Sequence, residues 1–145
     1  MLDYINRKFL INFFLTLIIF FLDRISKIYV ISQSEKNLFN DLYQSKFLNI
    51  SLIWNEGIAF GLLSFEKSHL YNFLTFLIII VVILIFFMIL RSEGLKKYSL
   101  LMIFGGALGN LYDRIFFKAV PDFIDFHIGN FHWFIFNVSD IFITL

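Results

Sequence analysis

Long apolar runs separated by short polar segments dominate the chain, and their lengths predict helices that cross a membrane. Residues 73–90 read FLTFLIIIVVILIFFMIL, with no charge and a single hydroxyl. A helix rises about 1.5 Å per residue and the hydrocarbon core of a bilayer is about 30 Å thick, so about 20 apolar residues suffice to cross it. We therefore predict a membrane span over about 70–90.

A second apolar run follows Arg7 and Lys8 near the start of the chain and extends over residues 9–22. This order resembles the front of a secretory signal peptide, and a cleavable signal peptide is the alternative interpretation. No pair of small residues follows the run. Instead DRISK leads into IYVI, so we expect an uncleaved helix that spans the membrane over about 9–30.

Two further spans are predicted in the second half of the chain. Residues 98–117 combine YSLLMIF with the small-residue stretch GGALG, and small residues let neighbouring helices approach closely. The last candidate covers 133–145 and would be only about 20 Å long, so we expect either a short helix or further residues beyond 145. The fold class is therefore mainly α, with one polytopic membrane domain over 1–145.

Basic residues near the ends of the predicted spans set their orientation, because cytoplasmic segments are enriched in Lys and Arg. They fall before the first span and between the second and third, at Arg7, Lys8, Arg91, Lys96 and Lys97. The loops over about 31–68 and 118–132 should then lie on the opposite, outer side. The outer segment KFLNISLIWNEGIAFGLL is rich in β-branched and aromatic residues, which favours a small extramembrane sheet.

Composition supports a membrane protein and excludes several kinds of function. Hydrophobic residues make up 59% of the 145 residues, and mean hydropathy is +0.81. The net charge of +1 provides no basic surface for nucleic acid, and the absence of Cys excludes disulfides and cysteine nucleophiles. His69, His127 and His132 have no metal-ligand spacing on a helix face, so we predict neither a metal site nor a cofactor.

Ionisable residues inside predicted spans are candidates for function, because their burial in lipid is costly. Asp23 and Lys27 are four residues apart, and we interpret them as a structural ion pair more readily than as catalytic groups. Asn110, Asp113 and Arg114 share one helical face and can satisfy one another. Arg114 would hold Asp113 ionised, which favours a supporting role for these three residues.

Polar residues in the predicted outer loops provide a second group of candidates. Asn55 and Gly57, within Asn55–Gly61, offer an amide and flexible backbone suited to hydrogen bonding with an extended peptide. A plain turn explains this segment equally well.

Carboxyl groups also occur near the predicted outer ends of the third and fourth spans. Asp122 and Asp125 lie among apolar residues, and Asp140 follows Asn137 by three positions. Two carboxyls held close together share a proton, and such a pair can perform aspartic proteolysis. Acids that only cap and cross-link helices are the structural alternative. A proton-coupled transport subunit and a membrane scaffold without activity are the functional alternatives.

Five motifs in order resemble the lipoprotein signal peptidase family, also called signal peptidase II, over nearly the whole chain. They are Asp-x-x-Ser-Lys, Asn-x-Gly-x-Ala-Phe-Gly, Gly-Asn-x-x-Asp-Arg, Val-x-Asp-Phe and Phe-Asn-x-x-Asp. In this sequence they occupy Asp23–Lys27, Asn55–Gly61, Gly109–Arg114, Val120–Phe123 and Phe136–Asp140.

The resemblance implies four transmembrane helices, an extramembrane β-cradle with a short outer helix, and the bacterial inner membrane as the location. It implies cleavage of diacylglyceryl-modified prolipoproteins before the lipidated Cys, at a site facing the outer side. The implied partners are this substrate and membrane lipid, without nucleic acid or metal, and the implied state is a monomer. Asp122 and Asp140 become the catalytic pair, and the supporting residues are Asn55, Gly57, Asn110, Asp113, Arg114 and Asn137.

Two residues depart from the family pattern beside the catalytic pair. Pro121 stands where an aliphatic residue is usual, removes an amide donor and fixes the local φ, so we expect a differently shaped segment around Asp122. Ser139 stands where Ala is usual, and we expect its hydroxyl to stabilise the ionised form of Asp140.

Overall fold

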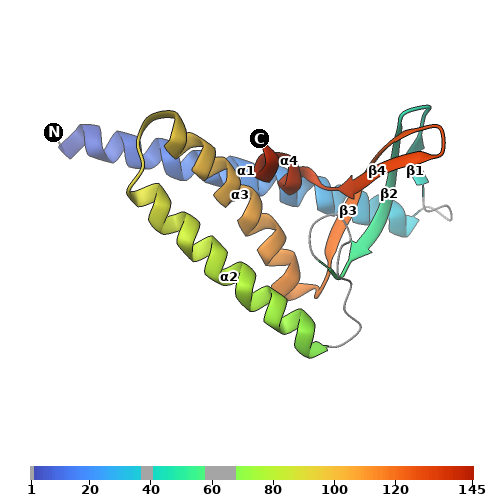
Figure 1. Cartoon of the computed structure of the whole chain (residues 1–145). Coiled ribbons are helices and arrows are strands. Elements are labelled where there is room, and N and C mark those ends of the chain that lie inside the picture. The colour runs from blue at the N-terminus through green and yellow to red at the C-terminus, as the bar shows by residue number, and fades with distance from the viewer. Residues whose placement is uncertain (1, 37–40, 58–67) are drawn as a thin grey trace.

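Four helices and a four-stranded antiparallel sheet make up the described part of the chain in a computed structural model (Figure 1). The structure describes residues 2–36, 41–57 and 68–145. In chain order the elements are α1 (Leu2–Lys36), β1 (Asp41–Gln44), β2 (Leu48–Asn55), α2 (Ser68–Leu90), α3 (Gly94–Phe116), β3 (Val120–Ile128), β4 (Phe131–Phe136) and α4 (Val138–Thr144). The protein is thus mostly helical, with a small sheet at one end of the bundle (Figure 1).

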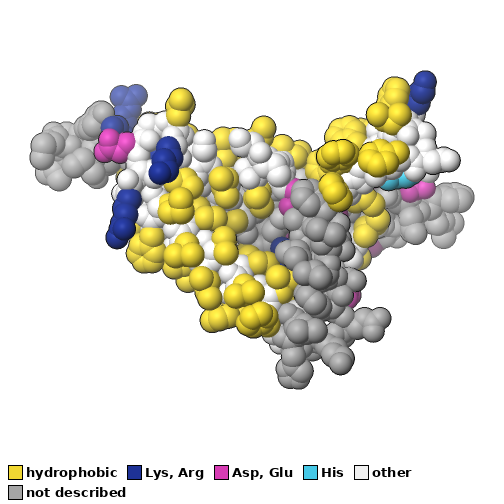
Figure 2. All heavy atoms as spheres, viewed as in Figure 1, with side chains coloured by type: hydrophobic (Ala, Val, Ile, Leu, Met, Phe, Trp, Pro, Cys, Tyr) yellow, Lys and Arg dark blue, Asp and Glu magenta, His cyan; other side chains and the backbone are white. Residues whose placement is uncertain are grey.

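Helices α1 and α2 carry most of the apolar surface. Over Arg7–Lys36 and Tyr71–Leu90 they are long and apolar enough to cross a membrane. Large side chains point outward along both, as with Ile25 at 64% exposure and Phe73 at 59%, and apolar side chains cover much of the face in Figure 2. A contiguous apolar surface of this extent needs lipid rather than water around it, so the protein belongs in a membrane.

Helix α3 lies between the other helices and contacts α1, α2 and α4. Its glycines make the close contacts possible. A Cβ added at Gly105 would lie 3.0 Å from the Cβ of Ile19 on α1, and one at Gly106 would lie 2.6 Å from the carbonyl oxygen of Ser139 on α4. The small-residue stretch therefore permits close helix packing, as its composition predicted.

The sheet has the order β1-β2-β3-β4, with every neighbouring pair antiparallel. Strand β2 lies in the segment KFLNISLIWNEGIAFGLL, in which a sheet was expected, whereas β1 precedes that segment. Strand β3 and most of the β3–β4 hairpin lie in the second predicted outer loop, 118–132, for which no strand was predicted. The hairpin turns at Gly129, whose φ of 59° is a left-handed conformation suited to glycine.

The fourth predicted helix, over 133–145, starts too early. Residues Phe131–Phe136 form strand β4, and helix α4 begins only at Val138. A short apolar run fits a buried strand as well as a helix, so periodicity could not separate the two. The resemblance also implied a short outer helix. Residues 41–57 of the predicted outer loop contain no helix, and residues 37–40 and 58–67 lie outside the described part.

Candidate active site

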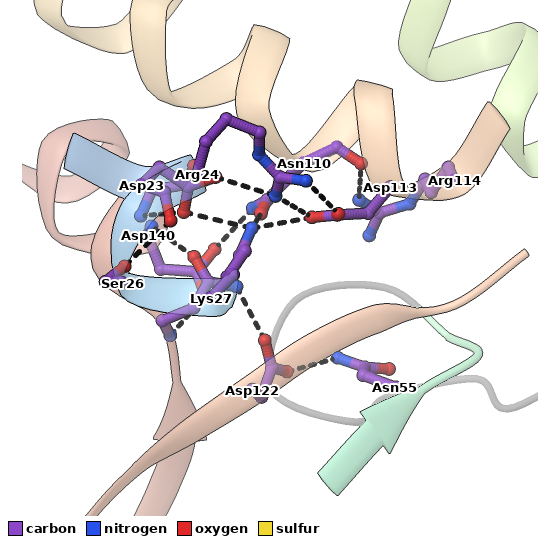
Figure 3. Close-up of polar contacts among 12 residues, drawn as sticks. Asp23, Arg24, Ser26, Lys27, Asn55, Asn110, Asp113, Arg114, Asp122 and Asp140 are labelled. Carbon is purple, nitrogen blue, oxygen red and sulfur yellow. Dashed lines mark hydrogen bonds and ion pairs between the residues drawn. The ribbon is translucent and has the colours of Figure 1, made fainter. Parts of the chain in front are cut away.

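Asp122 lies on β3, where amide groups from two other segments meet its carboxylate. The Nδ2 of Asn55, at the end of β2, donates to Oδ2 of Asp122 at 2.8 Å. The Nδ2 of Asn137, between β4 and α4, donates to Oδ1 at 2.6 Å. The carboxylate is only 3% exposed, so neutral amides replace most of its water. Figure 3 shows the contact from Asn55.

Pro121 precedes Asp122 on β3 and takes part in the β2–β3 pairing. It pairs with Trp54 of β2, whereas the pairing of β3 with β4 begins further along, at Ile124 and Phe136. At this point β3 has a partner strand on one side only, where a missing amide donor can be tolerated. Asp122 therefore lies on a strand, and the β2–β3 register shifts directly beside it, between Ile50 and Ile53 of β2.

Asp140 lies in the first turn of α4 and forms part of its cap. The backbone N–H of Asn137 donates to Oδ2 of Asp140 at 3.1 Å, and the backbone N–H of Asp140 donates to Oδ1 of Asn137 at 3.2 Å. This reciprocal pair is a capping box. The Nδ2 of Asn110, on α3, donates to the other carboxylate oxygen at 2.9 Å. Asn137 thus contacts both candidate catalytic acids.

Both carboxyls line one cavity of about 220 Å³ between α3, α4 and the sheet. Its polar wall comes from Asn55, Asn110, Arg114 and Asn137, and its apolar wall from Ile78, Ala107, Val120 and Ile143. The structure therefore brings five of the supporting or catalytic residues predicted from sequence to one place with Asp122. A molecule in this cavity would meet both acids and an apolar surface together.

Burial and, to a smaller extent, the nearby Asp140 carboxyl raise the pKa of Asp122 to about 6. The hydrogen bonds from Asn55 and Asn137 oppose this effect, because they favour the ionised form. A carboxyl with a pKa near 6 exchanges its proton close to neutral pH, which suits general acid–base catalysis.

A second polar cluster joins α1 to α3 beside the cavity. The Nζ of Lys27 lies 3.0 Å from Oδ1 of Asp23 and 2.7 Å from Oδ2 of Asp113, and it donates to Oδ1 of Asn110 at 2.8 Å. Arg24 contacts Asp113 through both terminal nitrogens at 2.6 Å and contacts Asp23 at 3.0 Å. Two acids and two bases balance here, and we call Asp23, Arg24, Lys27 and Asp113 the charge network (Figure 3).

Arg24 was missed by the sequence analysis, and the expected pairing of Asp113 with Arg114 was wrong. Asp113 binds Arg24 and Lys27 of α1 instead. Arg114 donates to the backbone carbonyls of Asn110 at 3.2 Å and Gly57 at 3.3 Å. Neighbouring positions on one helix cannot reveal a partner on another helix. The involvement of Arg24 could have been predicted from its position directly after Asp23, because a charged residue inside a predicted span needs a partner.

Ser139 also differs from its expected role beside Asp140. Its Oγ is buried and has no hydrogen-bond partner among the described residues, so the hydroxyl does not stabilise the Asp140 carboxylate. Its backbone N–H donates to Oδ1 of Asp23 at 3.0 Å. A Cβ added at Gly109 would contact this Oγ and would lie 2.5 Å from Oδ2 of Asp23. Ser139 therefore joins α4 to the charge network through its backbone.

The end of β2 lines the cavity with Asn55, whose side chain is held by Gly57. The N–H of Gly57 donates to Oδ1 of Asn55 at 2.8 Å, which leaves the Asn55 amide nitrogen directed at Asp122. Arg114 holds the carbonyl of Gly57 from the α3 side. The remaining part of this motif, residues 58–61, lies outside the described residues.

Comparison with known proteins identifies the family to which this arrangement belongs. The sequence model of the family described as Signal peptidase (SPase) II matches residues 15–145. The chain belongs to the signal peptidase II family. A lipoprotein signal peptidase of Pelagibacter ubique (strain HTCC1062) is 48% identical over 139 residues, covering 96% of this chain and 84% of that protein. One from Anaplasma phagocytophilum (strain HZ) is 38% identical over 138 residues, covering 95% of this chain and 87% of that protein.

Two solved structures of bacterial membrane enzymes share the fold of this chain. A bacterial membrane enzyme determined by the in meso method at 2.3 Å resolution has a TM-score of 0.76 and 27% identity, covering 92% of this chain and 80% of that one. A second bacterial membrane enzyme, at 1.9 Å, has a TM-score of 0.73 and 28% identity, covering 92% and 84%. The chain is thus a membrane protease, and the family assignment decides against the transport alternative.

Proposed function

We propose that this chain is an aspartic endopeptidase that removes signal peptides from diacylglyceryl-modified bacterial prolipoproteins, cleaving before the lipidated Cys. Asp122 and Asp140 are its catalytic residues. The observation that carries the proposal is the cavity into which both carboxyls open, each held by neutral amide donors. Within the described residues neither acid forms an ion pair with a base, so both remain available for proton transfer.

In the proposed reaction the pair of carboxyls carries one proton, because two neighbouring acids do not both ionise cheaply. A water molecule between them gives a proton to the ionised carboxylate, and its oxygen attacks the scissile carbonyl carbon. The protonated acid donates to the carbonyl oxygen, which gives a tetrahedral diol. Collapse of the diol breaks the C–N bond as the amine takes up a proton, and the shared proton returns to the pair.

Asp122 is suited to hold the shared proton, since its pKa of about 6 lies near working pH. The pair titrates as a unit, so this proton belongs to both acids together. Asn137 positions the two acids, because its side chain contacts Asp122 while its backbone and side chain contact Asp140. Asp122 and Asp140 thus supply the acid and base groups that the hydrolysis needs, and Asn137 holds them in position.

We propose that four helices, α1 to α4, cross or enter the bacterial inner membrane, with the site toward its outer face. Most of the basic side chains visible in Figure 2 gather at the end of the bundle that holds the start of α1 and the α2–α3 connection, opposite the sheet, and one group lies at the tip of the sheet (Figures 1 and 2). That distribution supports a cytoplasmic position for the basic end. Lipid chains of the substrate would then pack against apolar surface beside the cavity, in an enzyme that acts as a monomer.

Replacing either acid by its amide tests the assignment. Asp122→Asn and Asp140→Asn should each lower the cleavage rate of a lipidated precursor at least about 100-fold, because each removes an acid–base group. Cleavage is read as a mobility shift of the precursor on a gel. Asp41→Asn changes an exposed acid on β1 and should cleave at the normal rate. Normal turnover by purified Asp140→Asn protein would disprove the proposed mechanism, without changing the family to which the chain belongs.

A further inference from the structure

The β3–β4 hairpin brings together three potential metal ligands outside the catalytic cavity. Asp125 and His127 lie on β3 and His132 on β4, and one ligand atom from each lies within 4.8 Å of the others. We propose that Asp125, His127 and His132 form a binding site for a divalent transition metal ion, with Zn²⁺ the best match. This site is separate from the proposed proteolysis and needs no step of it.

Strand pairing explains why these side chains meet. His127 and His132 are direct partners in the β3–β4 register, and their rings stack with centroids 5.0 Å apart. The Nδ1 of His132 lies 2.8 Å from Oδ2 and 3.0 Å from Oδ1 of Asp125. Side chains with the spacing Asp-x-His-x-x-x-x-His do not share one face of a helix. In a hairpin that turns at Gly129, the three side chains can lie on one surface of the sheet.

The ligand set suits zinc more than a hard cation. Two imidazoles and one carboxylate are common zinc ligands, with Zn–N distances of about 2.0–2.1 Å and Zn–O distances of about 2.0–2.2 Å. Ca²⁺ and Mg²⁺ prefer sites built from oxygen. His132 is 49% exposed through its side chain, so its ring can turn to close the site and a water molecule can take the fourth position.

One atom of the cluster lacks a partner that a metal ion would supply. The Nδ1 of His127 is buried and has no hydrogen-bond partner among the described residues. Buried polar atoms are normally paired, so an unpaired nitrogen on a ring that stacks against His132 indicates a missing contact. Asp125 is 5% exposed and also receives the amide of Asn49 at 3.4 Å, which would orient it as a ligand.

The simpler interpretation is that Asp125 and His132 form only a cross-strand ion pair. That pair would stabilise the contact between β3 and β4 without any role for His127. Added Zn²⁺ would then neither bind stoichiometrically nor raise the unfolding midpoint. The two interpretations therefore differ in whether the whole chain binds one metal ion and whether His127 is needed for it.

Calorimetric titration of the full chain with ZnCl₂ separates them. The protein is purified in detergent without a polyhistidine tag and stripped with a chelator. One Zn²⁺ should bind per chain, and both His127→Gln and His132→Gln should weaken binding more than about tenfold, since even partners outside the ligand shell affect affinity by 10–100-fold. His69→Gln is the matched control and should bind normally.

Thermal unfolding provides a second readout that does not depend on heat of binding. A ligand that binds only the folded state raises its stability, so Zn²⁺ should raise the unfolding midpoint of the unaltered chain and of His69→Gln. It should not raise that of His127→Gln or Asp125→Asn. Absence of stoichiometric binding by the unaltered chain, or equal binding by His127→Gln, would overturn the proposal. Neither result would bear on cleavage by Asp122 and Asp140.

Discussion

Four buried aspartates lie within two adjoining regions of this bundle, and the two regions treat them differently. Asp23 and Asp113 belong to the charge network, where Arg24 and Lys27 neutralise them directly. Asp122 and Asp140 line the cavity and receive hydrogen bonds from neutral amides.

The difference distinguishes acids that are paired with bases from the two acids that we propose to carry out the reaction. A carboxylate paired with a buried base is held ionised and gives up its role as a proton carrier. A carboxylate that receives hydrogen bonds from amides is also held in position. Among the described residues no base forms an ion pair with Asp122, and burial raises the pKa of this carboxyl. Asn110 lies between the regions, since its Oδ1 accepts from Lys27 and its Nδ2 donates to Asp140. The neutral side chain of Asn110 thus links Asp140 to the charge network without placing a base against the Asp140 carboxylate.

Removing a charge from the network should have the largest effect on stability. Asp113→Asn leaves Arg24 and Lys27 with one carboxylate between them, and breaking a buried pair in this way costs about 3–5 kcal/mol of unfolding free energy. Denaturant or thermal unfolding in detergent measures the loss. Asp122→Asn is the matched change in the other region and should unfold close to the normal midpoint. Equal destabilisation by both would remove the proposed distinction.

A second change to the network tests whether charge balance is the cause. Combining Asp113→Asn with Arg24→Gln leaves Asp23 and Lys27 as one balanced pair. The double variant should therefore lose less stability than the sum of the two single variants, as expected for residues in direct contact. Strict additivity would show that the two side chains contribute independently.

The pH profile of cleavage should report the amide surroundings of Asp122. Activity requires one proton on the pair, so kcat/KM should fall as pH rises through the pKa of about 6. The hydrogen bond from Asn55 lowers this pKa, so Asn55→Leu should raise it and move the fall to higher pH.

Initial cleavage rates between acidic and mildly alkaline pH measure that shift. Asn130→Ala, an exposed residue in the hairpin turn, provides the control and should keep the original profile. A shift of the Asn55→Leu profile toward lower pH would contradict the proposed role of the amide.

The smallest effect is expected where the two regions touch. Ser139→Ala removes a buried hydroxyl without a described partner and keeps the backbone N–H that reaches Asp23. We expect an unchanged cleavage rate and a stability equal to or slightly above normal, by about 1 kcal/mol at most. A large loss of activity in the precursor assay would show that the hydroxyl acts on Asp140 after all.

The sequence predicted the apolar helices well because their length and purity leave few alternatives. The span placed at 70–90 nearly coincides with α2, and that placed at 98–117 overlaps most of α3. Strands β3 and β4 were missed because their short apolar runs fit loop and helix patterns equally. Trp133 to Phe136 then joined a predicted helix to which they do not belong.

The candidate site residues came from motif order, whereas the partners could not be predicted from spacing. Asp113 finds Arg24 on another helix, 89 positions away along the chain. Local rules place neighbours on one helix face, and they contain no information about which faces pack together. The same limit concealed the meeting of His127 with His132, which depends on strand register.

The capping box at the start of α4 links the proposed active site to the folding of the last helix. The hydrogen bonds between Asn137 and Asp140 cap the first turn of this helix and also position one of the two proposed catalytic carboxyls. The same Asn137 reaches across to Asp122 on the sheet. Asp122 on β3 and Asp140 on α4 therefore meet only through tertiary contacts, which require that the last helix has wound and packed against α3. On the proposed assignment, a chain in which α4 is unfolded would lack peptidase activity.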